Sequence, residues 1–171
     1  MPETYPIGRL ELPPTLDLGA VMLAIDRIEA LPEALRAALD GCADLDHPIR
    51  AGAWSIRQLS HHLADAHLVA YVRTKRALCE DGPTVRSYDP EAWARTPDAR
   101  LPVEPSLALL TGLHRRWVEL LRGLGPAELE RPWHVAGRTS TFALWRLPLT
   151  YAWHGDHHVA QVLRARAYYG V

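Results

Sequence analysis

The chain has 171 residues, of which 48% are hydrophobic and 23% charged, with a formal net charge of -1 at pH 7. This composition is typical of a globular protein, and the length predicts one domain with a sizeable core. The near-neutral charge argues against nucleic acid or an anionic membrane as a partner, and no apolar run is long enough to span a bilayer. The N-terminus lacks an export signal and the two cysteines are isolated, so we expect a cytoplasmic protein.

Hydrophobic spacing predicts four long helices. Residues 1–14 are interrupted by four prolines and a glycine, and we expect them to form an extended arm. The first helix is expected over residues 16–39, where apolar side chains recur every three or four positions. Pro32 interrupts this run, which is therefore either one kinked helix or two helices with Pro32 in the first turn of the second.

The second helix has the clearest start in the sequence. Ser55-Ile-Arg-Gln58 predicts a capping box, in which the serine and the glutamine each bond the backbone N–H of the other. Gly82-Pro83 predicts its end. Its inward stripe is formed by seven residues: Ile56, Leu59, Leu63, Ala66, Ala70, Arg73 and Ala77.

A long connection follows, from residue 82 to residue 105, in which Asp89 and Pro90 predict one short helical turn. The third helix is expected over residues 104–124 and the fourth over residues 141–168, with a kink at Pro148. We find no alternating pattern of a strand and no internal repeat. The sequence therefore predicts an all-α four-helix bundle, with residues 1–171 forming a single domain.

Two histidines stand where the fourth helix should present apolar residues to the core. Leu144, Leu147 and Tyr151 form an inward stripe, and the same spacing continues to His154 and His158. Histidines four residues apart have Cβ atoms about 6 Å apart on one helix face, and such a pair can coordinate one metal ion. The alternative is a pair of core histidines that bond backbone or carboxylate groups.

The second helix offers three candidates for a third metal ligand. His62 flanks the inward stripe, whereas His61 faces solvent and His67 lies on the other flank, so the geometry favours His62. His157 lies off the stripe of its own helix and is expected to be exposed. Three histidines would leave a fourth coordination position open, as in catalytic rather than structural sites. The ion would then lower the pKa of bound water or of a bound thiol.

Four further side chains are candidates for contact with the ligands or with a substrate: His114, Asp65, Arg57 and Tyr88. For His114 the alternative is a core histidine with satisfied hydrogen bonds, and for Asp65 it is a solvated carboxylate. Arg57, Arg73 and Arg86 could clamp an anionic group of a substrate, although surface arginines usually do not.

Several stretches of the chain resemble the DinB/YfiT-like family of metal-binding four-helix bundles. They are Tyr5-Pro-Ile-Gly8, Ala53-Trp-Ser-Ile-Arg-Gln-Leu-Ser-His-His-Leu-Ala-Asp-Ala-His67, Arg86-Ser-Tyr-Asp89 with Trp93, Leu113-His-Arg-Arg-Trp117, and Tyr151-Ala-Trp-His-Gly-Asp-His-His158. The resemblance implies one divalent ion per chain, Zn or Ni, held by His62, His154 and His158, and a homodimer. Two departures from the family pattern are Ser87 in place of proline and Gly155-Asp156 in place of Ser-His.

From these residues and this resemblance we predict a metal-dependent enzyme that acts on a small molecule. The reaction is either hydrolysis or the transfer of a low-molecular-weight thiol, of the bacillithiol type, to an electrophile. The alternative is a non-enzymatic metal-binding stress-response scaffold, in which the metal is structural.

Overall fold

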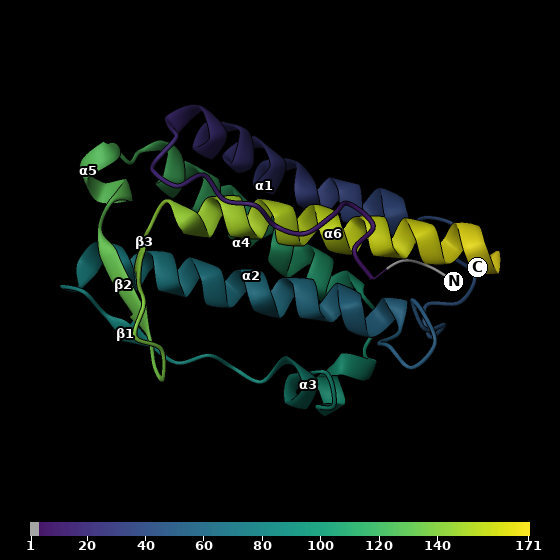
Figure 1. The fold of residues 1–171 in the computed structure, drawn as a ribbon. Coiled ribbons are helices and arrows are strands. Elements are labelled where there is room, and N and C mark those ends of the chain that lie inside the picture. Colours follow the sequence, from purple (N-terminus) through teal and green to yellow (C-terminus); the bar gives the residue numbers. More distant parts are fainter. Residues whose placement is uncertain (1–3) are drawn as a thin grey trace.

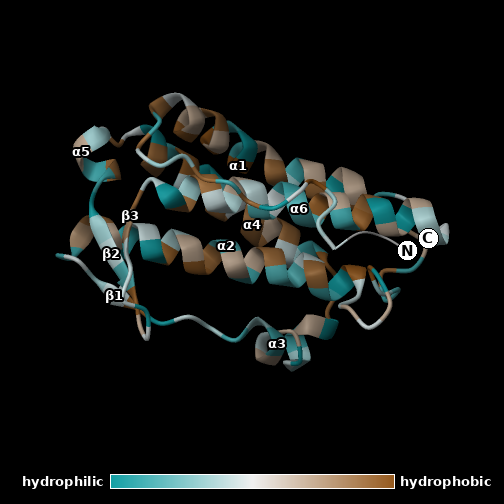
Figure 2. Ribbon diagram, in the orientation of Figure 1, coloured by the Kyte–Doolittle hydropathy of each residue, from teal (hydrophilic) through white to brown (hydrophobic). Residues whose placement is uncertain are grey.

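The computed structural model describes residues 4–171 as four long helices with a small sheet at one end (Figure 1). The long helices are α1 (Leu18–Leu39), α2 (Ile56–Cys79), α4 (Glu104–Arg122) and α6 (Arg146–Tyr169). Each carries both hydrophobic and hydrophilic residues, as expected for helices that bury one face (Figure 2). The predicted four-helix bundle is confirmed. None of the helices among the described residues is long and apolar enough to cross a membrane.

The helix starts follow the capping chemistry of the sequence. Ser55 and Gln58 form the predicted capping box, because the Ser55 Oγ accepts from the Gln58 N–H and the Gln58 Oε1 accepts from the Ser55 N–H. Asp17 caps α1 by accepting from the backbone N–H of Ala20. These side chains fix where α1 and α2 begin, and hence which residues face the core.

Helix α1 is continuous through Pro32, so the interpretation of two separate helices is wrong. Proline has no backbone N–H, and the carbonyl of Ile28, four residues earlier, therefore lacks the donor that an ordinary helix would supply. Another donor is needed because this carbonyl lies on the buried side of α1, where Ile28 itself is fully buried.

Helix α6 begins at Arg146, five residues later than predicted. Pro148 consequently lies in the first turn, where a backbone N–H has no partner within the helix in any case. The predicted kink at Pro148 is therefore wrong, because it assumed that this proline lies in the interior of the helix.

The prediction that the chain has no strand is also wrong. Strands β1 (Thr84–Val85), β2 (Pro132–Val135) and β3 (Thr141–Ala143) form a three-stranded sheet in the order β1-β2-β3. Strand β2 pairs parallel with β1 and antiparallel with β3. The short helix α5 (Pro126–Leu129) precedes β2. Strands of two to four residues are too short to show an alternating pattern in the sequence.

The long connection between α2 and α4 lies beside α2 (Figure 1). It contains the predicted short helix α3 (Pro90–Trp93), capped by Asp89, and a 3₁₀ turn, η1 (Pro97–Arg100). Tyr88 packs against Trp93 with ring centroids 4.5 Å apart. The connection thereby places an aromatic pair beside the start of α2.

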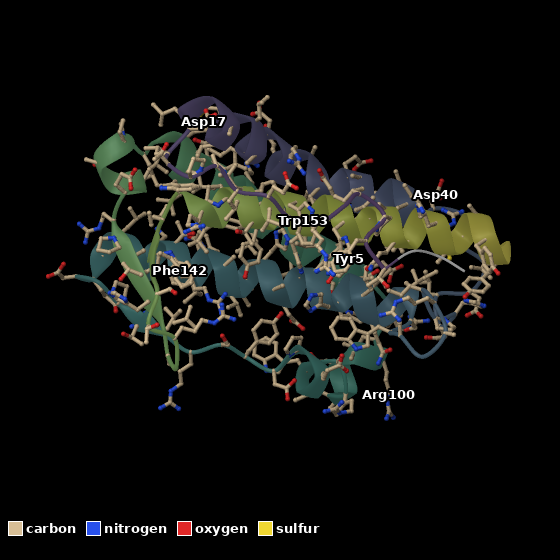
Figure 3. The ribbon with its side chains drawn as sticks, viewed as in Figure 1. Tyr5, Asp17, Asp40, Arg100, Phe142 and Trp153 are labelled. Atoms are coloured by element: carbon tan, nitrogen blue, oxygen red, sulfur yellow. The ribbon has the colours of Figure 1, made fainter. Side chains whose placement is uncertain are left out.

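The described part of the N-terminal segment, residues 4–17, contains no helix or strand and runs along α6 (Figures 1 and 3). The Gln161 side chain donates to the carbonyl of Thr4 at 3.0 Å, and the Tyr5 ring lies 5.6 Å from that of His157. Residues 1–3 of the predicted arm lie outside the described residues.

Helices α1 and α6 approach each other closely at Gly155. A Cβ atom at this position would lie 2.5 Å from Cδ2 and 3.0 Å from Cδ1 of Leu31, which is itself buried. One residue further along, Asp156 pairs with Arg27 of α1 at 2.6 Å. Glycine at position 155 therefore allows close packing between α1 and the part of α6 that carries His154 and His158.

We predict that Gly155→Ala lowers the free energy of unfolding by about 1–3 kcal/mol, because the added methyl group overpacks the contact with Leu31. Gly112→Ala is the matched control, since Gly112 is also helical but has open space at its Cβ position, and it should be neutral or slightly stabilising. The measurement is urea unfolding. The double variant Gly155→Ala with Leu31→Ala should lose less stability than the two single losses added together, and simple additivity would contradict the packing argument.

Candidate metal centre

Three imidazoles from two helices meet between α2 and α6. The Nε2 atom of His154 lies 3.2 Å from Nε2 of His62 and 3.1 Å from Nε2 of His158. One ring nitrogen from each of the three residues lies within 4.8 Å of the others, close enough to hold one metal ion. The structure thus brings together the three histidines that the sequence favoured. All three are partly exposed.

A chain of hydrogen bonds leads from His154, through the buried side chains of His67 and His114, to the backbone of α1. Nδ1 of His154 lies 3.4 Å from Nε2 of His67, and Nδ1 of His67 lies 3.0 Å from Nε2 of His114. Nδ1 of His114 lies 2.6 Å from the carbonyl oxygen of Ile28, the carbonyl that Pro32 leaves without a helical donor. We call His114, His67 and His154 the histidine chain.

The carbonyl end of the histidine chain determines where every hydrogen in it lies. A carbonyl oxygen only accepts, so His114 must donate from Nδ1, and a neutral His114 then accepts at Nε2. His67 must therefore donate from Nδ1 and accept at Nε2, and His154 must donate from Nδ1. The Nε2 of His154 is left with a free lone pair that points toward His62 and His158.

A second, shorter chain fixes the orientation of His158. The amide nitrogen of Gln161 donates to the carbonyl of Thr4, so the amide oxygen of Gln161 faces Nδ1 of His158, at 2.8 Å, and accepts from it. The Nε2 of His158 consequently also presents a lone pair. The described N-terminal segment thus takes part in holding the site.

These two chains leave two nitrogen lone pairs 3.1 Å apart, and among residues 4–171 only His62 is placed to supply a hydrogen to either of them. A cation that accepts both lone pairs removes this repulsion. Neutral imidazole is a common ligand of divalent transition metals, and a metal-ligating histidine typically donates its other N–H to a neighbouring acceptor. The residues present therefore fit a divalent metal ion.

Burial keeps these imidazoles neutral. It lowers the pKa of His62 and His114 to about 4 and that of His158 to about 3, because a charged ring loses its hydration. The pKa values of His67 and His154 are lowered well below the usual range for the same reason, and neighbouring histidines lower them further. At pH 7 all five rings are therefore available as hydrogen-bond acceptors or metal ligands.

Three expectations about the other histidines are wrong. His61, expected to face solvent, is buried and bonds both Ser106 Oγ and the carbonyl of Leu101. His67, expected at an edge, is fully buried in the histidine chain. His157, expected to be exposed, is buried against Trp153, with ring centroids 4.7 Å apart. Helical periodicity identifies the core face of a helix, but it does not show which connecting segments cover the other faces.

The remaining candidates are at different distances from the three imidazoles. The Tyr88 hydroxyl lies 3.4 Å from Nδ1 of His62, and burial raises its pKa, so it stays protonated. Asp65 shares a small cavity with His61 and His62, and burial raises its pKa as well. Arg57 is turned away, because its guanidinium pairs with Asp46 at 2.7 Å.

The cluster of His62, His154 and His158, which we call the imidazole group, is open toward one side. A cavity of about 260 Å³ reaches His158 and is also lined by Trp54, whose ring lies 4.7 Å from that of His62. A small molecule that enters this cavity can therefore reach the imidazole group. From the sequence, Trp54 was a candidate only for the rim of the site, and Gln161 was not identified as a partner of His158.

A helical bundle with three clustered imidazoles defines a class of metal-binding four-helix bundles, and comparison with known proteins agrees. Residues 27–162 match the family model described as the DinB superfamily. This chain belongs to the DinB superfamily.

Similar proteins cover nearly the whole chain. A protein of Geobacillus kaustophilus named “Putative metal-dependent hydrolase” is 45% identical over 168 residues, covering 96% of this chain and 94% of its own. A protein of Oceanobacillus iheyensis with the same description is 38% identical over 164 residues, covering 95% of each chain. The solved structure of YfiT from Bacillus subtilis, described as a “probable metal-dependent hydrolase with an unusual four-helix bundle topology”, has a TM-score of 0.93 and 34% identity. It covers 98% of this chain and 97% of its own.

We predict that the metal-free protein loses stability as the pH falls from 6.5 to 5. Unfolded histidines take up protons near pH 6.5, whereas the buried ones, with their lowered pKa values, do not, so acid favours the unfolded state. Each such histidine adds up to about 1.4 kcal/mol per pH unit to the slope of the free energy of unfolding against pH. Urea unfolding of chelator-treated protein at several pH values measures this slope. A free energy of unfolding that is constant over this interval would contradict the burial of neutral imidazoles.

Proposed function

We propose that this protein is a divalent-metal-dependent enzyme in which His62, His154 and His158 hold the ion. The observation that carries the proposal is the pair of Nε2 lone pairs, 3.1 Å apart, that the backbone carbonyls of Ile28 and Thr4 fix through their hydrogen-bond chains. The descriptions of similar proteins as a “putative” or “probable” metal-dependent hydrolase support the same function.

A divalent ion held by three neutral imidazoles keeps its full charge and supplies Lewis acidity, which lowers the pKa of water or of a thiol. His67 and His114 hold His154 in the tautomer that a ligand needs, and Gln161 does the same for His158. When Nε2 of His62 serves as a ligand, Nδ1 carries the hydrogen and donates toward the Tyr88 hydroxyl. Tyr88 then keeps its own hydrogen for an oxygen of the substrate.

The residues around the site favour a thiol over water as the nucleophile. The sequence contains no H-E-x-x-H motif, whose glutamate is the base of many metal-dependent hydrolases, and Glu91, which lines the cavity at His158, accepts a hydrogen bond from Trp54 Nε1. A thiol has a far lower pKa than water and needs less help to lose its proton. In the proposed reaction a sulfur–carbon bond forms to an electrophile, the bond to the leaving group breaks, and the thiol proton passes to solvent.

A structural metal in a scaffold protein is the second candidate function. It requires a fourth protein ligand, because structural sites usually close their coordination shell. The metal-ligating group found among residues 4–171 contains three residues, and it adjoins the cavity at His158. These two features favour the enzyme.

We predict that the purified protein binds about one divalent ion per chain, and that His62→Ala and His158→Ala abolish binding while the fold is retained. His61→Ala is the matched control, since His61 adjoins His62 but bonds Ser106 and Leu101, and it should keep the metal. Elemental analysis and calorimetric titration with Zn²⁺ and Ni²⁺ measure this. Metal retained by both ligand variants, or lost from His61→Ala, would show that the assignment of ligands is wrong.

The reaction is tested by mixing the metal-loaded protein with bacillithiol or cysteine and monochlorobimane, and with 4-nitrophenyl acetate in a parallel assay. We expect faster formation of the thiol–bimane adduct and release of chloride, both reduced at least 100-fold in His62→Ala. Acceleration of ester hydrolysis alone would identify a hydrolase and contradict thiol transfer. Acceleration of neither, together with unfolding on chelation, would support the scaffold.

A further inference from the structure

A second cavity lies on the other side of Tyr151 from the histidines. It has a volume of about 250 Å³ and lies where α2, the first turns of α6 and the sheet meet, beside the N-terminal segment. Figure 3 labels Phe142 of β3, which contributes one wall, and Figure 1 shows the strands at this end of the bundle. Neither the proposed metal ligands nor the cavity at His158 explains which residues line this second cavity.

The cavity combines apolar walls with positive charge. Trp133, Val135, Phe142, Leu147 and Leu12 form its apolar part, and the charged residues that line it are three arginines: Arg73, Arg138 and Arg146. None of the described carboxylates lines it, and none forms an ion pair with any of these arginines. Such a lining suits a molecule with a negatively charged group on an apolar body.

Arg73 gives the strongest indication of an anion. It occupies a position of the inward stripe of α2, and its Nε atom is buried with no hydrogen-bond partner. Its one hydrogen-bond partner among the described residues is the neutral hydroxyl of Tyr151, to which Nη1 donates at 3.2 Å. A guanidinium held partly inside a protein without a counter-ion is costly, whereas an anion in the cavity would supply both the charge and the missing acceptor.

The other two arginines surround the same space from different elements. The Arg146 guanidinium lies over the rings of Phe142 and Trp145, at 5.9 Å and 5.4 Å from their centroids, which keeps it beside the cavity. Arg138 is exposed in the turn between β2 and β3. Three guanidinium groups from α2, α6 and this turn therefore share one small cavity.

The cavity is next to the imidazole group. The Tyr151 ring lies 5.6 Å from that of His154, and burial together with the neighbouring Tyr151 raises the pKa of Tyr88, which contacts His62. Tyr151 thus lines the cavity and also contacts one of the three imidazoles.

We propose that this cavity binds a small amphipathic organic anion, with Arg73 as the main partner of a carboxylate and Trp133, Phe142 and Leu147 packing against its apolar part. It would hold the anionic end of a substrate whose reactive atom reaches the imidazole group. The identification of the ligand as a substrate rests on the proposed function, whereas the binding of the anion does not.

The test uses hexanoate as the probe and hexanamide as its neutral match, added to the full chain both with its metal and after chelation. The Arg side-chain Nε–Hε signals in NMR spectra report binding at the guanidinium groups. We expect millimolar binding of hexanoate, at least tenfold weaker binding of hexanamide, and the largest shift at Arg73. Binding to the chelated protein would show that the carboxylate is not held by an ion.

The variants separate this site from the rest of the surface. Arg73→Gln should weaken hexanoate binding at least tenfold, Arg73→Lys should weaken it less, and Arg36→Gln, at an exposed arginine of α1, should not change it. Arg138→Gln, at an exposed position, should weaken it about threefold and provides the test if Arg73→Gln does not fold.

Equal affinity for hexanoate and hexanamide, or unchanged binding in both Arg73→Gln and Arg138→Gln, would overturn the proposal. A protein that binds no metal but shows the expected hexanoate pattern would contradict the proposed function and leave the anion site standing.

Discussion

The hydrogen bond from His114 to the carbonyl of Ile28 is the constraint on which the metal centre depends. Pro32 removes the helical donor of that carbonyl, so a residue that weakens helix α1 also creates a buried acceptor in the core. His114 and His67 transmit the direction of this acceptor to His154, whose Nε2 lone pair then faces His62. The backbone of one helix thus determines the protonation pattern of a proposed metal ligand on another helix.

The site and its surroundings are built from different parts of the chain. The three imidazoles lie on α2 and α6, the most regular elements, whereas the cavity with the three arginines is completed by a short sheet and the N-terminal segment. Tyr151 lines this cavity and also lies against His154. This division suits a site in which rigid helices position the ligands and less regular segments shape the space for a substrate.

The sequence predicted the parts that depend on local chemistry. Ser55 and Gln58 capped α2 as expected, and the spacing of His154 and His158, together with the flank position of His62, identified the imidazole group. The short strands could not be predicted, since they depend on pairing between residues far apart in the sequence. The burial of His61, His67 and His157 was missed because segments from elsewhere in the chain cover them. The proline at position 32 was visible in the sequence, but the hydrogen bond from His114 to the Ile28 carbonyl was not.

The tautomers of the histidine chain are the most direct test of this account. Long-range ¹⁵N–¹H NMR spectra of the ¹⁵N-labelled, metal-free protein at pH 7 distinguish a protonated Nδ1 from a protonated Nε2. We expect protonated Nδ1 and unprotonated Nε2 at His114, His67 and His154, and a mixture of tautomers in Pro32→Ala, where a new backbone N–H competes for the Ile28 carbonyl. A protonated Nε2 at His154 in the wild-type protein would contradict the account, because that nitrogen would then have no lone pair to offer a metal ion.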